Sequence, residues 1–145
     1  MFREFEENKV CFVCTANMAR SIMAESVLRK LRPDIEVFSC GILAIDGFNP
    51  TEETISVLEE KGYSCNGLVS KSVESCSFAD SVTFCMTTKQ KITLKSRFPK
   101  SEIYTLKTLN SIEKDITDPV KKGMEVYRET LNQIEKEIKR LFRDK

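Results

Sequence analysis

The chain has 145 residues, of which 41% are hydrophobic and 31% charged, a profile that fits one globular domain and excludes a disordered chain. Lysine and arginine together (23) nearly balance aspartate and glutamate (22), so no basic excess favours nucleic acid or an anionic membrane as a partner. The sequence contains no histidine, which excludes Ser-His-Asp hydrolases, Cys-His proteases and His-ligated metal sites.

The sequence also bears on cellular location. No apolar run reaches the roughly 18 residues that a membrane-spanning helix needs. The first eight residues include Glu4, Glu6 and Glu7 and lack the apolar stretch of a signal peptide. We therefore expect a cytoplasmic protein, in which the six cysteines are free thiols rather than a disulfide framework.

The first half of the chain predicts two strands, each followed by a helix. Residues 9–13 are apolar and β-branched or aromatic, which is typical of a buried strand. Residues 20–33 predict a helix that stops at its final proline, and residues 35–39 predict a second strand. A second helix is expected to begin at Asn49, its capping residue, and to end at Gly62.

The second half repeats this alternation. Residues 81–85 predict a strand, residues 89–98 a helix and residues 103–106 a fourth strand. Apolar residues at steps of three or four over residues 124–141 predict a long amphipathic helix. The predicted fold is a single three-layer α/β domain over residues 1–145, with a four-stranded parallel sheet and helices on both faces.

A cysteine, an arginine and a serine lie between the first strand and the first helix. Ligands bind beyond the carboxyl ends of parallel strands, and Cys14 lies at such an end. A loop that leads into a helix aims free backbone N–H groups at one point, and Arg20 can bind two oxygens of a phosphate. The positive charge of Arg20 and of the helix N-terminus is also expected to favour the thiolate of Cys14, and Ser21 can donate a hydrogen bond to it. Asn17 suits the left-handed conformation that a tight loop imposes on one residue.

The spacing of Cys14 and Arg20 is by itself weak evidence for a phosphate-binding loop. The position of the two residues between a predicted strand and a predicted helix makes a chance occurrence improbable. The segment resembles the phosphate-binding loop of the low-molecular-weight protein tyrosine phosphatases, Cys-x5-Arg-Ser followed by a helix containing Met-Ala-Glu, here residues 23–25. The resemblance extends to Ser39-Cys-Gly and implies that Cys14 is the nucleophile, that Arg20 binds phosphate and that no metal or cofactor takes part. The implied supporting residues are Thr15, Ala16, Asn17, Met18, Ala19 and Ser21.

The loop departs from the family pattern at several positions. Ala16 replaces a usual Gly and Ile22 a common Pro. Ala19 replaces a Cys that many members carry, so a disulfide within the loop is impossible. Leu68 stands where a His commonly steadies the loop Asn. None of these changes removes a group that does the chemistry.

The resemblance also implies a proton donor late in the chain. Its position is Asp118, which precedes Pro119; Asp118 is expected to protonate the leaving group and then to activate water against a phosphocysteine. The alternative is that Asp118 only caps the helix predicted to follow directly. Asp115 is expected to have a minor role, either by sharing charge with Asp118 or only as a surface residue.

Phosphorylated proteins are the expected substrates, and two branches of the family compete. Residues 104–107 and the segment from Asp118 to Thr130 resemble the bacterial protein arginine phosphatases. Those enzymes favour Thr at the position of Met18, whereas a bulky apolar residue there is typical of the tyrosine-specific members. The sequence therefore favours phosphotyrosine. Three further residues are candidate walls of the substrate pocket: Ile45, Phe48 and Val120. For Ile45 and Phe48 the alternative is a place in the hydrophobic core.

The remaining cysteines offer two other interpretations. Cys11 and Cys14 form a C-x-x-C pair, but residues an odd number apart face opposite sides of a strand, so Cys11 is expected to be a core thiol. Thioredoxin-coupled arsenate reductases share this fold and loop and use two more cysteines spaced seven apart. Here Ile92 stands seven residues after Cys85, and Cys76 precedes Cys85 by nine. The reductase shuttle is incomplete.

Overall fold

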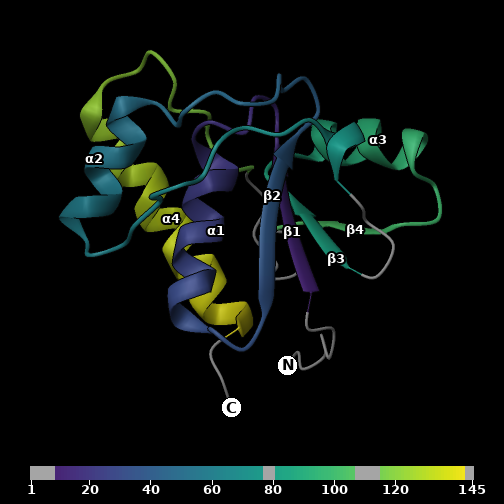
Figure 1. Ribbon diagram of the computed structural model, residues 1–145, viewed down its shortest axis with the longest axis horizontal. Coiled ribbons are helices and arrows are strands. Elements are labelled where there is room, and N and C mark those ends of the chain that lie inside the picture. Colours follow the sequence, from purple (N-terminus) through teal and green to yellow (C-terminus); the bar gives the residue numbers. More distant parts are fainter. Residues whose placement is uncertain (1–8, 77–80, 107–114, 143–145) are drawn as a thin grey trace.

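The computed structural model describes residues 9–76, 81–106 and 115–142, and its centre is a parallel sheet (Figure 1). The strands lie in the order β2-β1-β3-β4, and every neighbouring pair is parallel. Their bounds are β1 (Lys9–Cys14), β2 (Glu36–Gly41), β3 (Val82–Cys85) and β4 (Glu102–Thr105). The predicted four-stranded parallel sheet is confirmed.

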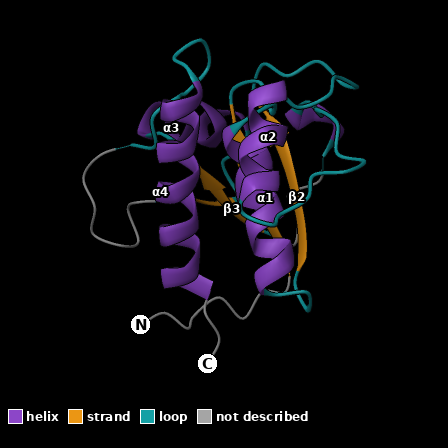
Figure 2. Cartoon of the chain, turned by 90° about the vertical axis from the view of Figure 1, so that its left-hand side faces the viewer, coloured by secondary structure: helices purple, strands orange, loops and turns teal. Residues whose placement is uncertain are grey.

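Helices cover both faces of this sheet (Figures 1 and 2). Three of them, α1 (Arg20–Leu31), α2 (Glu52–Glu60) and α4 (Met124–Phe142), lie on one face, while α3 (Thr88–Arg97) lies on the other. A 3-10 turn, η1, covers Val73–Ser75. The alternation of β1 separates two cores: Phe12 and Cys14 pack toward α1 and α4, and Cys11 and Val13 pack toward α3. Cys11 is therefore a core thiol on the face opposite Cys14, as predicted.

One predicted helix start was wrong. Asn49 does not cap α2, because Thr51 accepts a hydrogen bond from the Thr54 N–H (3.2 Å) and the helix begins at Glu52. The last helix begins at Met124, as the apolar spacing predicts, and so does not follow directly on Pro119. Asp118 accepts a hydrogen bond from the Val120 N–H (3.2 Å), so it holds a turn before the helix and does not cap α4.

The carboxyl end of β1 is fixed by its neighbour β2. Cys14 pairs with Gly41, and the chain beyond continues the contact: the Ile42 N–H bonds to the Cys14 carbonyl (3.0 Å) and the Leu43 N–H to the Thr15 carbonyl (2.9 Å). A Cβ atom on Gly41 would lie 2.6 Å from the Thr15 carbonyl oxygen, so the close approach requires glycine. The segment after β2 is thereby held against the residues that follow β1.

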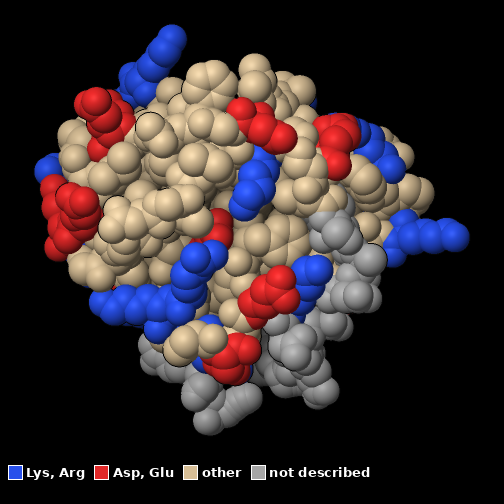
Figure 3. Space-filling model, in the orientation of Figure 1, with Lys and Arg blue, Asp and Glu red and all other residues tan. Residues whose placement is uncertain are grey.

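The surface carries charges of both signs. On the face shown in Figure 3, Lys and Arg side chains alternate with Asp and Glu side chains, in keeping with the near balance of the whole sequence. Within the described parts of the chain, none of the helices combines the length and apolar character needed to cross a membrane.

Candidate active site

The loop between β1 and α1 wraps around the sulfur of Cys14. The Asn17 N–H lies 3.3 Å from Sγ and the Ser21 hydroxyl 3.0 Å from it. Asn17 adopts the left-handed conformation (φ 58°), which turns its N–H toward the sulfur. Cys14 is buried, and α1 begins six residues later at Arg20. The Asn17 N–H and the Ser21 hydroxyl therefore converge on one buried sulfur atom.

The side-chain amide of Asn17 sets the direction of the hydrogen bonds around this sulfur. Its Nδ2 donates to the Ser21 hydroxyl (2.7 Å) and the Ser39 hydroxyl (2.9 Å), while its Oδ1 accepts from the Lys71 N–H (2.9 Å). Because both amide hydrogens go to hydroxyl oxygens, the Ser21 hydroxyl keeps its own hydrogen for the sulfur. The Lys71 backbone orients this amide in a chain without histidine.

Glu25 closes the network on its buried side. Ser39 donates to its carboxylate (2.6 Å), and Arg29 from the next turn of α1 forms an ion pair with it. The Glu25 side chain is almost fully buried, and this burial raises the pKa of its carboxyl above the ordinary value, against the opposing effect of Ser39 and Arg29. Because Ser39 accepts from Asn17, its single hydroxyl hydrogen is free to be donated to Glu25.

Replacing Glu25 with Gln should change how stability depends on pH. A raised pKa means that the folded protein binds this proton more tightly than the unfolded chain, so the Glu25 contribution is complete below the unfolded pKa and is lost as pH rises through the folded pKa. For each pH unit in that window, the free energy of unfolding of wild type falls by at most about 1.4 kcal/mol. Urea unfolding of both proteins from pH 4 to 8 should show wild type losing stability relative to Glu25→Gln; the opposite trend would mean that the pKa is lowered.

Arg20 and Asp118 meet on the open side of the loop. The guanidinium is buried and donates to the Ile116 carbonyl (3.0 Å), and its second terminal nitrogen lies 3.6 Å from the Asp118 carboxylate. The Asp118 side chain is 53% exposed, so it faces solvent. The structure therefore brings together two side chains that the sequence singled out, Arg20 and Asp118, at the end of the loop that begins at Cys14.

The segment that carries Asp118 is tied to the start of α3. Asp115 accepts from the Thr88 N–H (3.1 Å) and hydroxyl (3.3 Å), and the Ile116 N–H bonds to the Met86 carbonyl (3.0 Å). Asp115 thus accepts a hydrogen bond from an N–H group in the first turn of α3 that has no partner within the helix. This tethering role was not predicted from the sequence, because it depends on which helix lies beside the segment.

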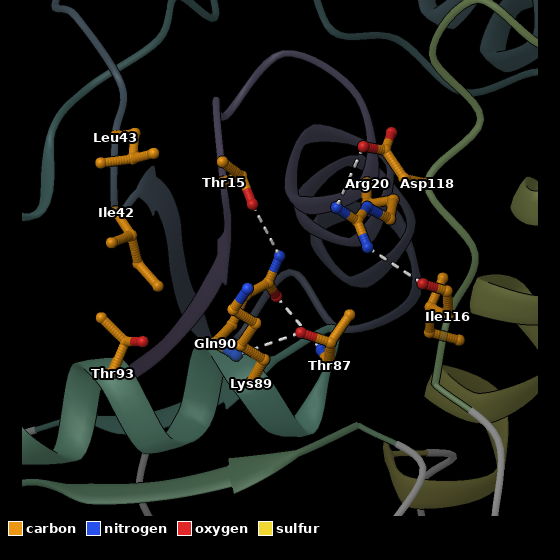
Figure 4. Close-up of a pocket in the computed structure, with 10 residues that line it drawn as sticks. All are labelled: Thr15, Arg20, Ile42, Leu43, Thr87, Lys89, Gln90, Thr93, Ile116 and Asp118. Atoms are coloured by element: carbon orange, nitrogen blue, oxygen red, sulfur yellow. Dashed lines mark hydrogen bonds and ion pairs between the residues drawn. The ribbon is translucent and has the colours of Figure 1, made fainter.

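A pocket of about 430 Å³ opens beside the loop (Figure 4). It extends from Arg20 and Asp118, past Thr15, to Ile42 and Leu43. The remaining lining residues among the described part of the chain are Thr87, Lys89, Gln90, Thr93 and Ile116.

The three predicted wall residues are not among those that line this pocket in the described chain. Ile45, Phe48 and Val120 are exposed at 69%, 53% and 40%. Sequence reasoning missed Ile42 and Leu43, although their place directly after the Ser39-Cys-Gly segment was an available signal.

Comparison with known proteins agrees with this geometry. The model of the family "low molecular weight phosphotyrosine protein phosphatase" matches residues 9–145. The chain belongs to this family. It is 36% identical over 138 residues to a protein-arginine-phosphatase of Geobacillus stearothermophilus, covering 92% of this chain and 93% of the relative. It is 31% identical over 127 residues to the low molecular weight protein-tyrosine-phosphatase PtpB of Staphylococcus haemolyticus, covering 87% and 91%.

Solved structures give the same picture. The low molecular weight phosphatase fold of this chain superimposes on a cysteine-to-serine mutant of the YwlE arginine phosphatase with a phosphorylated active-site serine. The TM-score is 0.82 at 26% identity, covering 92% of each chain. The protein is thus a member of a family of cysteine-dependent protein phosphatases, and the family includes the arginine phosphatase branch.

The other cysteines differ from Cys14 in their surroundings. All six cysteines lie in the described residues and are free thiols. Burial raises the pKa of Cys85 to about 12, and burial likewise raises the pKa of Cys11, whose sulfur lies 3.7 Å from that of Cys40. The raised pKa values make both of these thiols poor nucleophiles at neutral pH.

Proposed function

We propose that this phosphatase hydrolyses phosphotyrosine in proteins through a phosphocysteine on Cys14. The observation that carries the proposal is the pair of donors on the Cys14 sulfur, 3.0 and 3.3 Å away, together with the Arg20–Asp118 pair on the open side of the same loop. A nucleophile, an anion-binding arginine and a carboxyl group are the parts that phosphoryl transfer through a covalent intermediate needs.

In the first step the Cys14 thiolate attacks phosphorus in line with the tyrosyl oxygen. The S–P bond forms, the P–O bond to the substrate breaks, and Asp118 gives its proton to the departing phenolate. In the second step Asp118 takes a proton from water, the water oxygen attacks phosphorus and the S–P bond breaks. Inorganic phosphate and the Cys14 thiolate are regenerated. The phosphorylated active-site serine of the YwlE mutant supports a covalent intermediate at the equivalent loop.

Arg20 has a specific part in both steps. Its guanidinium already has one nitrogen fixed on the Ile116 carbonyl, and the other lies 3.6 Å from Asp118. A phosphate dianion competes for that second nitrogen, because it carries more charge than the carboxylate and can accept two parallel hydrogen bonds. Phosphate binding thereby frees Asp118 to act on the leaving group. The buried loop N–H groups share the charge that develops on the equatorial oxygens.

Met18 carries the choice of phosphotyrosine over phosphoarginine. Its carbonyl accepts from the Thr51 N–H (3.1 Å) and the Thr54 hydroxyl (3.2 Å), so the start of α2 fixes the backbone of this residue. The half-buried methionine side chain adds apolar surface where the arginine phosphatases favour a small Thr, and apolar surface suits an aromatic ring. The 36% identity to an arginine phosphatase makes phosphoarginine the competing substrate.

Two matched peptides decide between these substrates. Wild type should hydrolyse a phosphotyrosine peptide at least about tenfold faster, in kcat/KM, than the corresponding phosphoarginine peptide. Met18→Thr should move this ratio toward phosphoarginine, because the ring loses an apolar contact. A ratio below one for wild type would assign the enzyme to the arginine branch. Arsenate-dependent oxidation of thioredoxin, without phosphate release from either peptide, would instead support the reductase interpretation.

A further inference from the structure

The pocket beside the catalytic loop has two ends of different character. Arg20 and Asp118 form a charged end, whereas Ile42 and Leu43 form an apolar end on the far side of Thr15 (Figure 4). The volume of about 430 Å³ falls within the range of about 300–1,000 Å³ that is typical of small-ligand pockets. The charged end lies at the phosphate loop, so the apolar end is left for a second group of the substrate.

The apolar end is fixed relative to the nucleophile. Backbone hydrogen bonds join Ile42 to the carbonyl of Cys14 (3.0 Å) and Leu43 to the carbonyl of Thr15 (2.9 Å). Between the two ends, Gln90 donates to the Thr15 hydroxyl (3.0 Å) and accepts with its own carbonyl oxygen from the Met86 N–H (3.0 Å). The floor of the pocket is therefore held in place before any ligand arrives, which lowers the entropic cost of binding.

Leu43 presents apolar surface to solvent at the rim of this preformed pocket. Its side chain is 74% exposed, although its backbone is hydrogen-bonded and its neighbour Ile42 is half-buried. A polypeptide that places a phosphorylated side chain beside Arg20 and Asp118 can run past Thr15, because the pocket is continuous along this line. The side chain next to the phosphorylated residue then lies within reach of Ile42 and Leu43.

We propose that the Ile42–Leu43 end is a substrate subsite that binds an apolar side chain adjacent to the phosphorylated residue. The proposal rests on the proposed phosphatase function and narrows its substrate class to phosphoproteins with a leucine-like neighbour. Burial of a leucine side chain in this half of the pocket corresponds to a preference of about tenfold for leucine over a small polar side chain.

The test uses phosphotyrosine peptides that differ only in the neighbouring residue, Leu or Ser, on either side of the phosphotyrosine. Wild type should prefer the Leu peptide about tenfold in kcat/KM on one of the two sides. Leu43→Ser should abolish this preference. Ile92→Ser is the matched control, because Ile92 is also exposed (65%) but is not among the described residues that line the pocket.

A second measurement separates this subsite from the proposed function. The same peptides are titrated by calorimetry into Cys14→Ser, with and without Leu43→Ser, and the affinity ratio should again be about tenfold and should depend on Leu43. Equal affinity and equal kcat/KM for the Leu and Ser peptides would overturn the subsite, as would an equal loss of preference in Ile92→Ser. If no peptide is hydrolysed but the affinity ratio holds, the proposed function fails and the subsite stands.

Discussion

Replacing Cys14 with Ser is expected to reduce kcat for phosphotyrosine peptides by at least about 10⁴-fold. The new hydroxyl can keep the hydrogen bonds from the Asn17 N–H and Ser21, so the loop and phosphate binding persist. An alcohol is a much weaker acid than a thiol, however, and the chain has no histidine to act as its base. Steady-state release of inorganic phosphate from a phosphotyrosine peptide measures the loss.

Mass spectrometry adds a positive signal to this loss of activity. If attack still occurs slowly, Cys14→Ser should accumulate a covalent phosphate on the introduced hydroxyl over long incubation, as the phosphorylated serine of the related YwlE mutant suggests. Cys76→Ser is the matched control, because Cys76 is a partly exposed thiol packed against the sheet face opposite Cys14, and it should keep wild-type kcat. Full activity in Cys14→Ser, or a comparable loss in Cys76→Ser, would contradict the assignment of the nucleophile.

The strands and the place of the loop between β1 and α1 could be predicted from the sequence because both depend on local signals. The apolar run of β1 and the polar residues that follow it place Cys14 at the carboxyl end of a parallel strand, where ligands bind. The spacing from Cys14 to Arg20 then brings the arginine to the first position of α1. These inferences need only one strand, one loop and one helix that are contiguous in the chain.

The supporting contacts could not be predicted, because each joins segments far apart in sequence. The Lys71 N–H meets Asn17 across 54 positions, and Asp115 meets Thr88 across 27. Backbone N–H groups leave no signature in the sequence, so nothing local indicates that Lys71 orients the loop amide. The alternative that Asp118 only caps the last helix is wrong for a related reason: Asp-Pro is a common helix start, but residues 119–123 form a turn before α4 begins.

The same long-range contacts explain how a small chain can hold the carboxyl group of Asp118 in place, as its proposed role of proton donor requires. Asp118 is more than half exposed, and a carboxylate on a free surface segment would sample many positions. Here the bonds of Asp115 to Thr88 and of Ile116 to Met86 and Arg20 fix the backbone within three residues of Asp118. The Asp118 carboxyl group is therefore positioned by α3 and by Arg20 together.

Replacing Asp118 with Ala should slow hydrolysis of an aryl phosphate with a poor leaving group by about 100-fold or more, since that phenolate needs a proton to depart. Hydrolysis of p-nitrophenyl phosphate should slow much less, because p-nitrophenolate can leave without being protonated. Asp115→Ala should give the same leaving-group pattern with a smaller loss of about tenfold, because it loosens the donor without removing it. Initial rates across a series of aryl phosphates give this dependence. Equal slowing of all substrates by Asp118→Ala would place Asp118 in phosphate binding through Arg20 rather than in proton transfer.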